Sequence, residues 1–334
     1  MLPIFHPTTT ILVDDVLSYL ESVVAAAPPE APILPFDSPA KAIAHIQQKN
    51  REAKEAFNSF LNVSADTDRV VIHNRPVQEQ IVRLNIGGLP AKVNQPSRFD
   101  EVSVIICDYA MPFMKGTDFF EKLGDIPQKR ILLTGEADST IAVQAFNDGI
   151  IDQFITKGQP GAIQRLFGLV RRYQRDYFSH QYASLMTAYW STDSLFVMPQ
   201  FDKLVQQLRD QHGFLEHYYV NFPDGALLFD EGQKRKRLVA LRDEDYDSML
   251  ELLAERPDVD PEFICQLAAR AVVPNESYGL GPSGDFTYWK EMCRPALKFE
   301  HPAGDLYFAL FDLRDEIDLD QARFFGDYEL RRLI

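Results

Sequence analysis

Acidic side chains follow two apolar runs of the sequence. The run Val102–Cys107 ends at Asp108. The run Thr10–Val13 ends at the paired acids Asp14 and Asp15. Carboxylate oxygens are the ligands that a hard divalent cation such as Mg²⁺ requires. If the two runs lie side by side, the three acids form a candidate magnesium site.

Two further runs end in a hydroxyl and in an ammonium group. The run Arg130–Leu133 is followed by Thr134, and the run Asp152–Thr156 is followed by Lys157. A threonine hydroxyl and a lysine ammonium both donate hydrogen bonds to phosphoryl oxygens. The combination of acids, hydroxyl and lysine predicts phosphoryl transfer, with the phosphoryl group placed on Asp108.

The elements that carry these side chains are expected to be strands of a parallel sheet. Short, wholly apolar runs bounded by turn residues are typical of strands that are buried on both faces. The carboxyl ends of such strands meet at one edge, where open α/β sheets bind their ligands. The sequence therefore predicts a doubly wound α/β domain. The alternative is an unrelated doubly wound sheet with incidental acids at its strand ends.

The order of these pieces resembles the receiver domain of two-component response regulators. This resemblance implies a flavodoxin-like receiver with a five-stranded parallel sheet. It also implies a cytoplasmic signalling protein that is not an enzyme. The matching motifs are Asp14-Asp15, Asp108-Tyr109-Ala110-Met111-Pro112 with Gly116 eight positions after Asp108, Thr134-Gly135, and Lys157.

The resemblance implies a role for each residue around the acceptor. Asp108 would accept the phosphoryl group from a sensor histidine kinase or a phosphotransfer protein. Asp15 would bind Mg²⁺ directly, and Asp14 would bind it through water or as a second acid. Asp108 itself and the backbone carbonyl of Ala110 would complete the protein ligands of the metal.

The resemblance also implies a switch. Lys157 would pair with the phosphoryl oxygens, Thr134 would move to hydrogen-bond the phosphoryl group, and Phe154 would turn inward with it. The signal would leave through the face formed by residues 139–190, which is the expected homodimer interface. Gly158 stands where the family has a proline, and this departure puts the loop geometry around Lys157 in question.

The spacing of the acids predicts an insert. Asp14 and Asp108 lie 94 positions apart, from 108 − 14. Receivers usually place these acids at roughly half that spacing by the same resemblance. The extra residues fall at about 62–101, inside a receiver that spans 1–160. A hairpin, a longer helix or a lid would each account for them, and a packed surface elaboration without chemistry is the simplest interpretation.

Two further segments follow the predicted receiver. An apolar stripe with helical spacing predicts a long linker helix over 160–190. Residues 191–334 alternate strand and helix patterns, which predicts an α+β output domain. The tyrosine-rich pattern at 217–221, the Phe-Asp-Leu pattern at 311–313 and the insert also resemble the Legionella-type α-hydroxyketone quorum-sensing response regulators.

Charge and composition limit the partners. The net charge is −15, and residues 181–334 carry −12 of it, from 16 basic and 28 acidic residues. This balance does not support nucleic-acid binding, although a DNA-binding output remains possible. The three cysteines show no paired spacing, which fits a reducing cytoplasm. We expect no signal peptide and no membrane-spanning segment.

The predicted function is therefore a response regulator whose phosphorylation switches dimerisation and an output domain, in gene regulation or quorum sensing. Two alternatives remain open. The first is a protein-binding module that phosphorylation tunes without nucleic-acid output. The second is a nucleotide-linked enzyme in residues 191–334, suggested by the glycine pattern at 279–284. That pattern lacks a clear preceding strand and contains a proline, so a flexible loop is the simpler interpretation.

Overall fold

The chain folds into two compact units in a computed structural model. One, here called the N-terminal unit, holds Pro7–Asn85 and Ser97–Gln181. The other, the C-terminal unit, holds Met1–His6, Ile86–Pro96 and Tyr182–Ile334. The residues that the structure describes are 2–28, 30–58, 61–64, 69–72, 75–78, 81–84, 95–135, 139–183, 194–221, 223–232, 234–254, 256–275 and 288–313.

The N-terminal unit is built on a five-stranded sheet with the order β12-β11-β8-β2-β3. All four pairings in this sheet are parallel. The predicted doubly wound, five-stranded receiver sheet is therefore confirmed. Its strands are β2 (Thr9–Val13), β3 (Ile33–Phe36), β8 (Val102–Asp108), β11 (Lys129–Thr134) and β12 (Gln153–Thr156).

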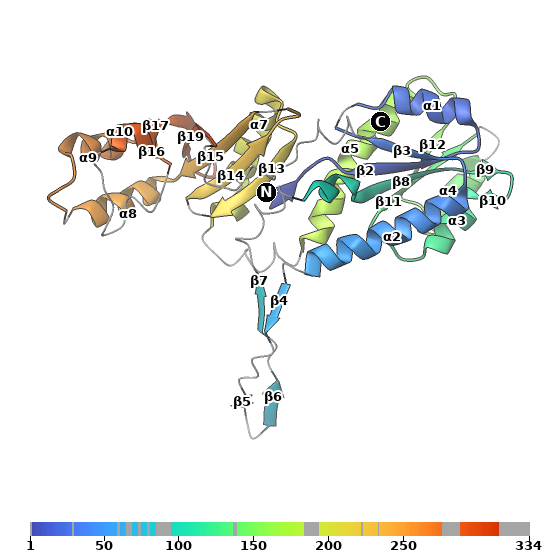
Figure 1. Cartoon of the computed structure of the whole chain (residues 1–334), viewed down its shortest axis with the longest axis horizontal. Helices are drawn as coiled ribbons and strands as arrows, with labels where there is room; N and C mark the ends of the chain where they lie inside the picture. Colours follow the sequence, from blue (N-terminus) through green and yellow to red (C-terminus); the bar gives the residue numbers. More distant parts are fainter. Residues whose placement is uncertain are drawn as a thin grey trace. The chain divides into compact units, whose positions relative to one another are not determined.

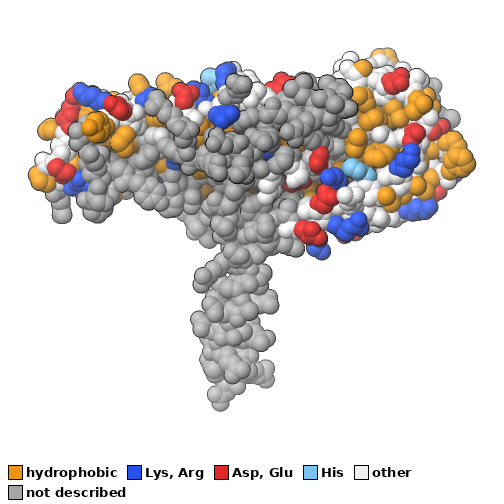
Figure 2. Space-filling view, viewed as in Figure 1, with side chains coloured by type: hydrophobic (Ala, Val, Ile, Leu, Met, Phe, Trp, Pro, Cys, Tyr) orange, Lys and Arg blue, Asp and Glu red, His pale blue; other side chains and the backbone are white. Residues whose placement is uncertain are grey.

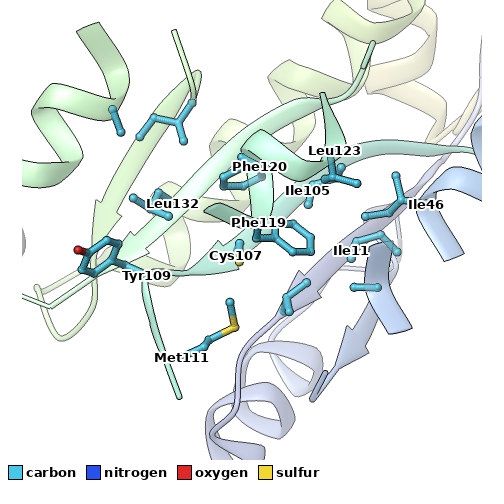
Figure 3. Packing of buried hydrophobic residues seen from close by; sticks show 14 of the residues in the cluster. Ile11, Ile46, Ile105, Cys107, Tyr109, Met111, Phe119, Phe120, Leu123 and Leu132 are labelled. Atoms are coloured by element: carbon cyan, nitrogen blue, oxygen red, sulfur yellow. The ribbon is translucent and has the colours of Figure 1, made fainter. Parts of the chain in front are cut away.

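Helices cover both faces of this sheet because successive strand side chains point to opposite faces. One apolar cluster joins Ile105 and Cys107 of β8 to α2, α3 and α4 (Figures 1 and 3). A second cluster joins the alternate residues Val104 and Ile106 to α1 and α5. The helices are α1 (Leu17–Ala25), α2 (Pro39–Asn58), α3 (Gly116–Leu123), α4 (Ser139–Asn147) and α5 (Ala162–Gln181).

The central strand β8 carries apolar side chains at five of its seven positions, Val102, Val104, Ile105, Ile106 and Cys107. Every residue from Val102 to Asp108 is buried. Each fully buried valine or isoleucine side chain contributes about 1.5–3 kcal/mol relative to exposure. The core on both faces thus fixes β8, and it brings a carboxylate to the sheet edge at the last position of the strand.

The insert contains two antiparallel strand pairs. Strand β4 (Leu61–Ser64) pairs with β7 (Ile81–Leu84), and β5 (Arg69–Ile72) pairs with β6 (Arg75–Gln78). The inner pair lies within the outer pair in sequence, which is the pairing of a long hairpin. A short 3-10 helix, Pro96–Asp100, then leads into β8.

The C-terminal unit has a six-stranded antiparallel sheet with the order β1-β13-β14-β15-β19-β18. A small strand pair, β16 with β17, and several helices complete the α+β unit (Figure 1). Its elements are β1 (Ile4–Phe5), η5 (Leu195–Val197), α7 (Pro199–His212), β13 (Glu216–Asn221), β14 (Asp224–Phe229), β15 (Arg235–Leu241), α8 (Asp243–Leu253), α9 (Pro261–Ala268), β16 (Val272–Pro274), α10 (Trp289–Met292), β17 (Cys293–Pro295), β18 (Leu297–Phe299) and β19 (Leu306–Asp312).

The division of the chain differs from the predicted boundaries at two places. Strand β1 pairs with β13 in the C-terminal unit, with Ile4 opposite Tyr218, so the first residues do not belong to the N-terminal unit. Helix α5 lies in the N-terminal unit as far as Gln181. Its buried residues, such as Leu166 and Val170, pack on the sheet, so this helix is part of a domain core along its described length.

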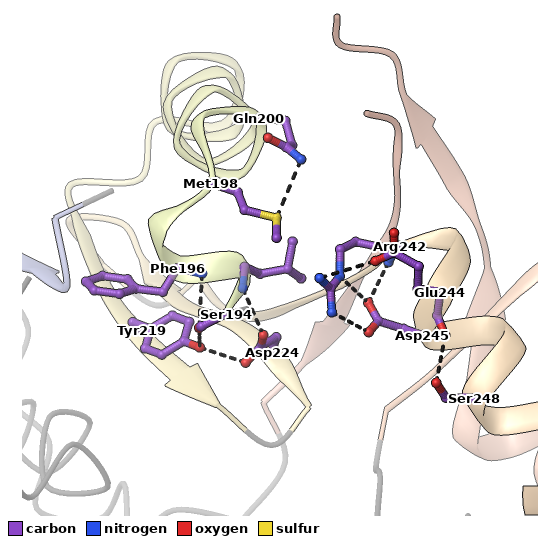
Figure 4. A network of polar contacts seen from close by, with 11 residues as sticks. Ser194, Phe196, Met198, Gln200, Tyr219, Asp224, Arg242, Glu244, Asp245 and Ser248 are labelled. Carbon is purple, nitrogen blue, oxygen red and sulfur yellow. Dashed lines mark hydrogen bonds and ion pairs between the residues drawn. The ribbon is translucent and has the colours of Figure 1, made fainter. Parts of the chain in front are cut away.

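A partly buried acid, Asp224, connects the start of η5 to the β13–β14 hairpin (Figure 4). The Tyr219 hydroxyl donates to Asp224 Oδ1 at 2.6 Å, and the Leu195 amide donates to Asp224 Oδ2 at 3.2 Å. The Ser194 and Tyr219 hydroxyl oxygens lie 2.9 Å apart. Burial raises the pKa of Asp224, even though these hydrogen bonds act to lower it.

We therefore expect the stability of the Asp224→Asn variant relative to the wild type to increase as the pH rises through the folded pKa of Asp224. A carboxyl whose folded pKa lies above its unfolded value of about 3.9 contributes most stability below that pH. This contribution is lost as the pH rises through the folded pKa of Asp224. Urea unfolding at a series of pH values measures the effect. A difference between the two proteins that stays constant with pH would contradict it.

Two predictions fall outside the described residues: the glycine pattern at 279–284 and the end of the predicted linker helix. Among the helices that the structure describes, none is long and apolar enough to span a bilayer.

Candidate functional site

The candidate site lies at the carboxyl edge of the parallel sheet. Strand pairing places Val13 of β2 opposite Cys107 of β8, and Leu133 of β11 opposite Asp108. Thr134 lies opposite Thr156 of β12. The residues predicted for the site follow or end these four neighbouring strands, so the fold brings them to one edge, as expected for an open α/β sheet.

The three acids form one cluster. Carboxylate oxygens of Asp14, Asp15 and Asp108 all lie within 4.8 Å of one another. Asp14 is fully buried, the Asp108 side chain is 9% exposed, and Asp15 is exposed. An oxygen-only set with an open side suits Mg²⁺, which retains several waters when it binds to protein carboxylates. The residues present therefore fit a magnesium ion.

Lys157 bridges two of these acids. Its Nζ lies 2.6 Å from Asp14 Oδ2 and 2.6 Å from Asp108 Oδ1. Burial acts to lower the pKa of Lys157, but its hydrogen bonds to Asp108 and Asp14 outweigh burial and raise that pKa above the ordinary value. Burial also raises the pKa of Asp14, against the lowering effect of the Lys157 hydrogen bond. The lysine is thus a fixed cation beside Asp108.

Thr134 holds a buried hydroxyl at the end of β11. The residue is fully buried, and its Oγ1 has no hydrogen-bond partner among the described residues. Its backbone carbonyl accepts a hydrogen bond from the Lys157 amide at 2.8 Å, which links the ends of β11 and β12. Leaving a buried hydroxyl without a hydrogen bond costs about 1–3 kcal/mol of folding stability. The Thr134 hydroxyl therefore suits a role in which it forms a hydrogen bond only when an anion is present.

The Thr134→Val variant should therefore be more stable than the wild type by about 1 kcal/mol. Valine keeps the shape of threonine and removes the unpaired hydroxyl. Urea unfolding measures the change in the free energy of unfolding. Thr10→Val is a matched comparison, because Thr10 in β2 also has a buried Oγ1 without a partner among the described residues. A loss of stability in Thr134→Val alone would show that the Thr134 hydroxyl has a partner.

Backbone contacts around Gly116 set the position of Asp108. The Ala110 amide donates to Asp108 Oδ2 at 2.9 Å, and the Gly116 amide donates to the Tyr109 carbonyl at 3.0 Å. A Cβ atom at Gly116 would lie 2.5 Å from the Asp108 carbonyl oxygen, which is closer than atoms can pack. The glycine eight positions after Asp108 therefore allows the turn to close against the strand that carries the acid.

Gly158 and Phe154 show how the Lys157 loop is built. Gly158 has a φ of +78°, a left-handed conformation that proline cannot adopt because its ring fixes φ near −65°. The glycine that departs from the family pattern thus matches the loop that this chain forms. Phe154 is partly buried and packs against the cluster that contains α3 and α4.

The structure adds one residue that the sequence analysis did not select. The ring centroid of Tyr19, in α1, lies 4.3 Å from Lys157 Nζ. The only sequence signal is an aromatic residue in the first turn of the helix that follows the paired acids, and core packing alone would account for that position.

Comparisons with known proteins agree with this fold. The structure is similar to that of the Legionella pneumophila response regulator LqsR, with a TM-score of 0.78 and 22% sequence identity over 100% of this chain and 96% of that chain. Two further likenesses are partial and have low TM-scores. They are a response regulator receiver domain protein from Clostridium thermocellum (0.29, 15% identity, 50% of this chain and 94% of that chain) and an adenylate cyclase from Rhodopirellula baltica (0.33, 20% identity, 55% and 98%).

No protein-family model and no curated protein matches the sequence. The full-length likeness therefore shows the fold: a flavodoxin-like receiver joined to an additional antiparallel sheet, as in LqsR.

Proposed function

We propose that this chain is a response regulator of a two-component phosphorelay that accepts a phosphoryl group on Asp108 in the presence of Mg²⁺. One observation carries the proposal: a buried strand end places Asp108 within reach of every group that this chemistry needs. Oxygens of Asp14 and Asp15 lie within 4.8 Å of it, and the Lys157 ammonium lies at 2.6 Å. Thr134, whose hydroxyl has no hydrogen-bond partner among the described residues, ends the neighbouring strand β11.

The proposed reaction moves a phosphoryl group from a phosphohistidine of a sensor kinase or phosphotransfer protein. An oxygen of Asp108 attacks phosphorus, so that a P–O bond forms while the P–N bond breaks. The leaving imidazole keeps the electron pair and takes a proton from water. Mg²⁺ held by Asp14, Asp15, Asp108 and the Ala110 carbonyl would supply positive charge to the phosphoryl oxygens. Lys157 donates hydrogen bonds to the same oxygens.

The phosphorylated state would then bias a switch. The added charge of nearly −2 attracts the Lys157 ammonium and the Thr134 hydroxyl. Movement of Thr134 at the end of β11 is transmitted to Phe154 in β12. The two strands are paired, with Thr134 opposite Thr156. The proposed homodimer forms through the face at 139–190. In support, α4 leaves three apolar side chains 40–47% exposed, Ile141, Val143 and Phe146.

Figure 2 gives a view of the surface of the N-terminal unit, where apolar side chains gather on the face in view. Exposed apolar side chains of this kind favour contacts with another protein surface over contacts with nucleic acid. The net charge of −12 over 181–334 favours the same conclusion for the rest of the chain. We therefore infer that phosphorylation switches dimerisation through these surfaces, and that the dimer controls an output domain in gene regulation or quorum sensing.

A phosphorylation-tuned binding module without nucleic-acid output is the second candidate, and the acidity of residues 181–334 favours it. The two candidates share the acceptor site and differ in the output. We infer a cytoplasmic location, with which the three free cysteines agree. Retention on DNA that falls steeply with added salt would favour nucleic-acid output, and its absence would favour the binding module.

Incubation of the full chain with acetyl phosphate and Mg²⁺ tests the proposal. Intact mass should show the gain of a single phosphoryl group, and light scattering should show a larger dimer fraction. Removal of Mg²⁺ with EDTA should prevent the gain, because the acids then lack the cation that neutralises the phosphoryl oxygens. An unmodified mass with several small phosphodonors at saturating Mg²⁺ would contradict the proposed acceptor function.

A further inference from the structure

The ring of Tyr19 lies over the ammonium of Lys157. Tyr19 is in the first turn of α1 and packs partly buried against the apolar cluster of α1 and α5. Its ring centroid is 4.3 Å from Lys157 Nζ, which is within the range of a cation–π interaction. The aromatic ring therefore contacts the same ammonium that the two acids bind.

The ammonium is held from more than one side. Asp14 and Asp108 each accept a hydrogen bond from Lys157 at 2.6 Å. The ring of Tyr19 comes from α1, while the acids come from β2 and β8. The Lys157 side chain is only 24% exposed. Partial removal from water strengthens a cation–π contact, because fewer water molecules then compete with the ring for the ammonium.

Little else in the described structure fixes where this ammonium lies. A lysine side chain has a flexible four-carbon stem, so the backbone position does not determine the position of Nζ. The Lys157 amide is bonded to the Thr134 carbonyl at 2.8 Å, which anchors only the main chain. The next residue, Gly158, has no side chain, and a Cβ atom added there would meet nothing within 4 Å.

We propose that Tyr19 is a positioning residue for phosphoryl transfer, whose ring face holds the Lys157 ammonium at the Asp108 carboxylate. The inference rests on the proposed function of Asp108. A bound cation would compete with Lys157 for Asp14, and the ring would then keep the ammonium next to Asp108, where the phosphoryl oxygens arrive. The hydroxyl of Tyr19 has no part in this role, since the ring face makes the contact.

The ionisation of Tyr19 is consistent with this role. Burial raises the pKa of its hydroxyl, although the charge of Lys157 acts to lower it. The phenol therefore stays neutral near pH 7 and adds no further negative charge to the three acids. A neutral ring can hold the ammonium without competing with Asp108 for it.

The test compares an aromatic substitution of Tyr19 with non-aromatic substitutions in the full-length protein. Initial rates of phosphorylation by acetyl phosphate with saturating Mg²⁺ are measured for Tyr19→Phe, Tyr19→Leu and Tyr19→Met. Tyr19→Phe should stay within about twofold of the wild type, and the other two should be slower by roughly three- to tenfold. Rates are normalised to the folded fraction from urea unfolding, so a variant that is only less stable is not scored as slow.

A double-mutant cycle separates positioning from packing. In a Lys157→Met background, Tyr19→Leu should cause no further loss of rate, because the ammonium that the ring holds is absent. Tyr173→Leu is a control for packing: its ring is buried in the same cluster of α1 and α5, but its centroid lies 5.8 Å from Lys129 Nζ and not at Lys157. It should lower stability and leave the normalised rate unchanged.

Each outcome supports or overturns the inference. If the wild type accepts no phosphoryl group, the proposed function and this inference both fail. If the wild type is phosphorylated and Tyr19→Leu equals Tyr19→Phe, only the role of Tyr19 is overturned. An equal loss from Tyr19→Leu with and without the lysine assigns the effect to packing and overturns it too. If Lys157→Met accepts no phosphoryl group, the rates of Tyr19→Phe, Tyr19→Leu and Tyr19→Met alone decide whether the ring of Tyr19 is required.

Discussion

The Asp108→Asn variant should accept no phosphoryl group under the conditions in which we expect the wild type to be phosphorylated. An amide oxygen is a far weaker nucleophile than a carboxylate oxygen, and the variant also removes a negative charge from the Mg²⁺ cluster. Asparagine keeps the shape of aspartate, and its carbonyl oxygen can still accept the Ala110 amide that bonds Asp108 Oδ2 at 2.9 Å. The fold should therefore be retained. Intact mass after incubation with acetyl phosphate and Mg²⁺ measures the loss.

Asp118→Asn provides the matched control for this result. Asp118 is an exposed acid in the first turn of α3, and the same change there removes the same charge from the same unit. Asp118→Asn should be phosphorylated as fast as the wild type. A phosphoryl group that still appears on Asp108→Asn at the wild-type rate would exclude Asp108 as the acceptor.

The Gly116→Ala variant should lose both stability and phosphorylation. The added methyl group would lie 2.5 Å from the Asp108 carbonyl oxygen and 2.7 Å from Leu132 Cδ1. Overpacking of this kind costs about 1–3 kcal/mol, because the backbone on one side has to move. That backbone carries Asp108, and a misplacement of about 1 Å costs on the order of 100-fold in rate. Urea unfolding and the initial phosphorylation rate measure the two effects.

Gly168→Ala separates this effect from a general effect of glycine replacement. Gly168 lies in α5, and a Cβ atom there would meet nothing within 4 Å. Alanine in a helix interior is favoured over glycine by about 1 kcal/mol, so this variant should be more stable and equally active. If Gly116→Ala behaved in the same way, the close approach to Asp108 would not control the acceptor.

The parallel sheet could be predicted because its strands appear in the sequence as short, mostly apolar runs between turn residues. The seven consecutive buried positions of β8 are mostly apolar, and a short run of this kind between turn residues is typical of a strand covered on both faces. The carboxyl-edge placement of Asp14, Asp108, Thr134 and Lys157 then follows from parallel pairing. These residues could therefore be selected from sequence, and the geometry brings them together.

The C-terminal unit was predictable only as a class. The patterns of β13, β14 and β19 alternate enough to be read as strands, but the sheet order depends on contacts between distant residues. Strand β1 has two residues, Ile4 and Phe5, and its pairing with Tyr218 and His217 spans more than 200 positions. No periodicity can show in so short a segment, so its assignment to the C-terminal unit was missed.

Contacts to side chains from other elements were also beyond the sequence. The predicted role of Lys157 rested on its place in a motif, whereas its bridge to Asp14 joins residues 143 positions apart. The approach of Tyr19 depends on the packing of α1 against the sheet. Gly158 stands where the receiver family has a proline, and the sequence alone could not show how this change affects the loop after Lys157. Its φ of +78° shows that the loop adopts a left-handed conformation at this residue.

The most direct test of the central claim is to locate the phosphoryl group. The phosphorylated protein is treated with borohydride, which reduces an acyl phosphate on aspartate to homoserine, and the modified residue is identified by peptide mass spectrometry. The result expected here is homoserine at position 108 and at no other acid of the cluster. Conversion at Asp14 or Asp15, or a stable phosphate on a serine, threonine or histidine with Asp108 intact, would contradict the account.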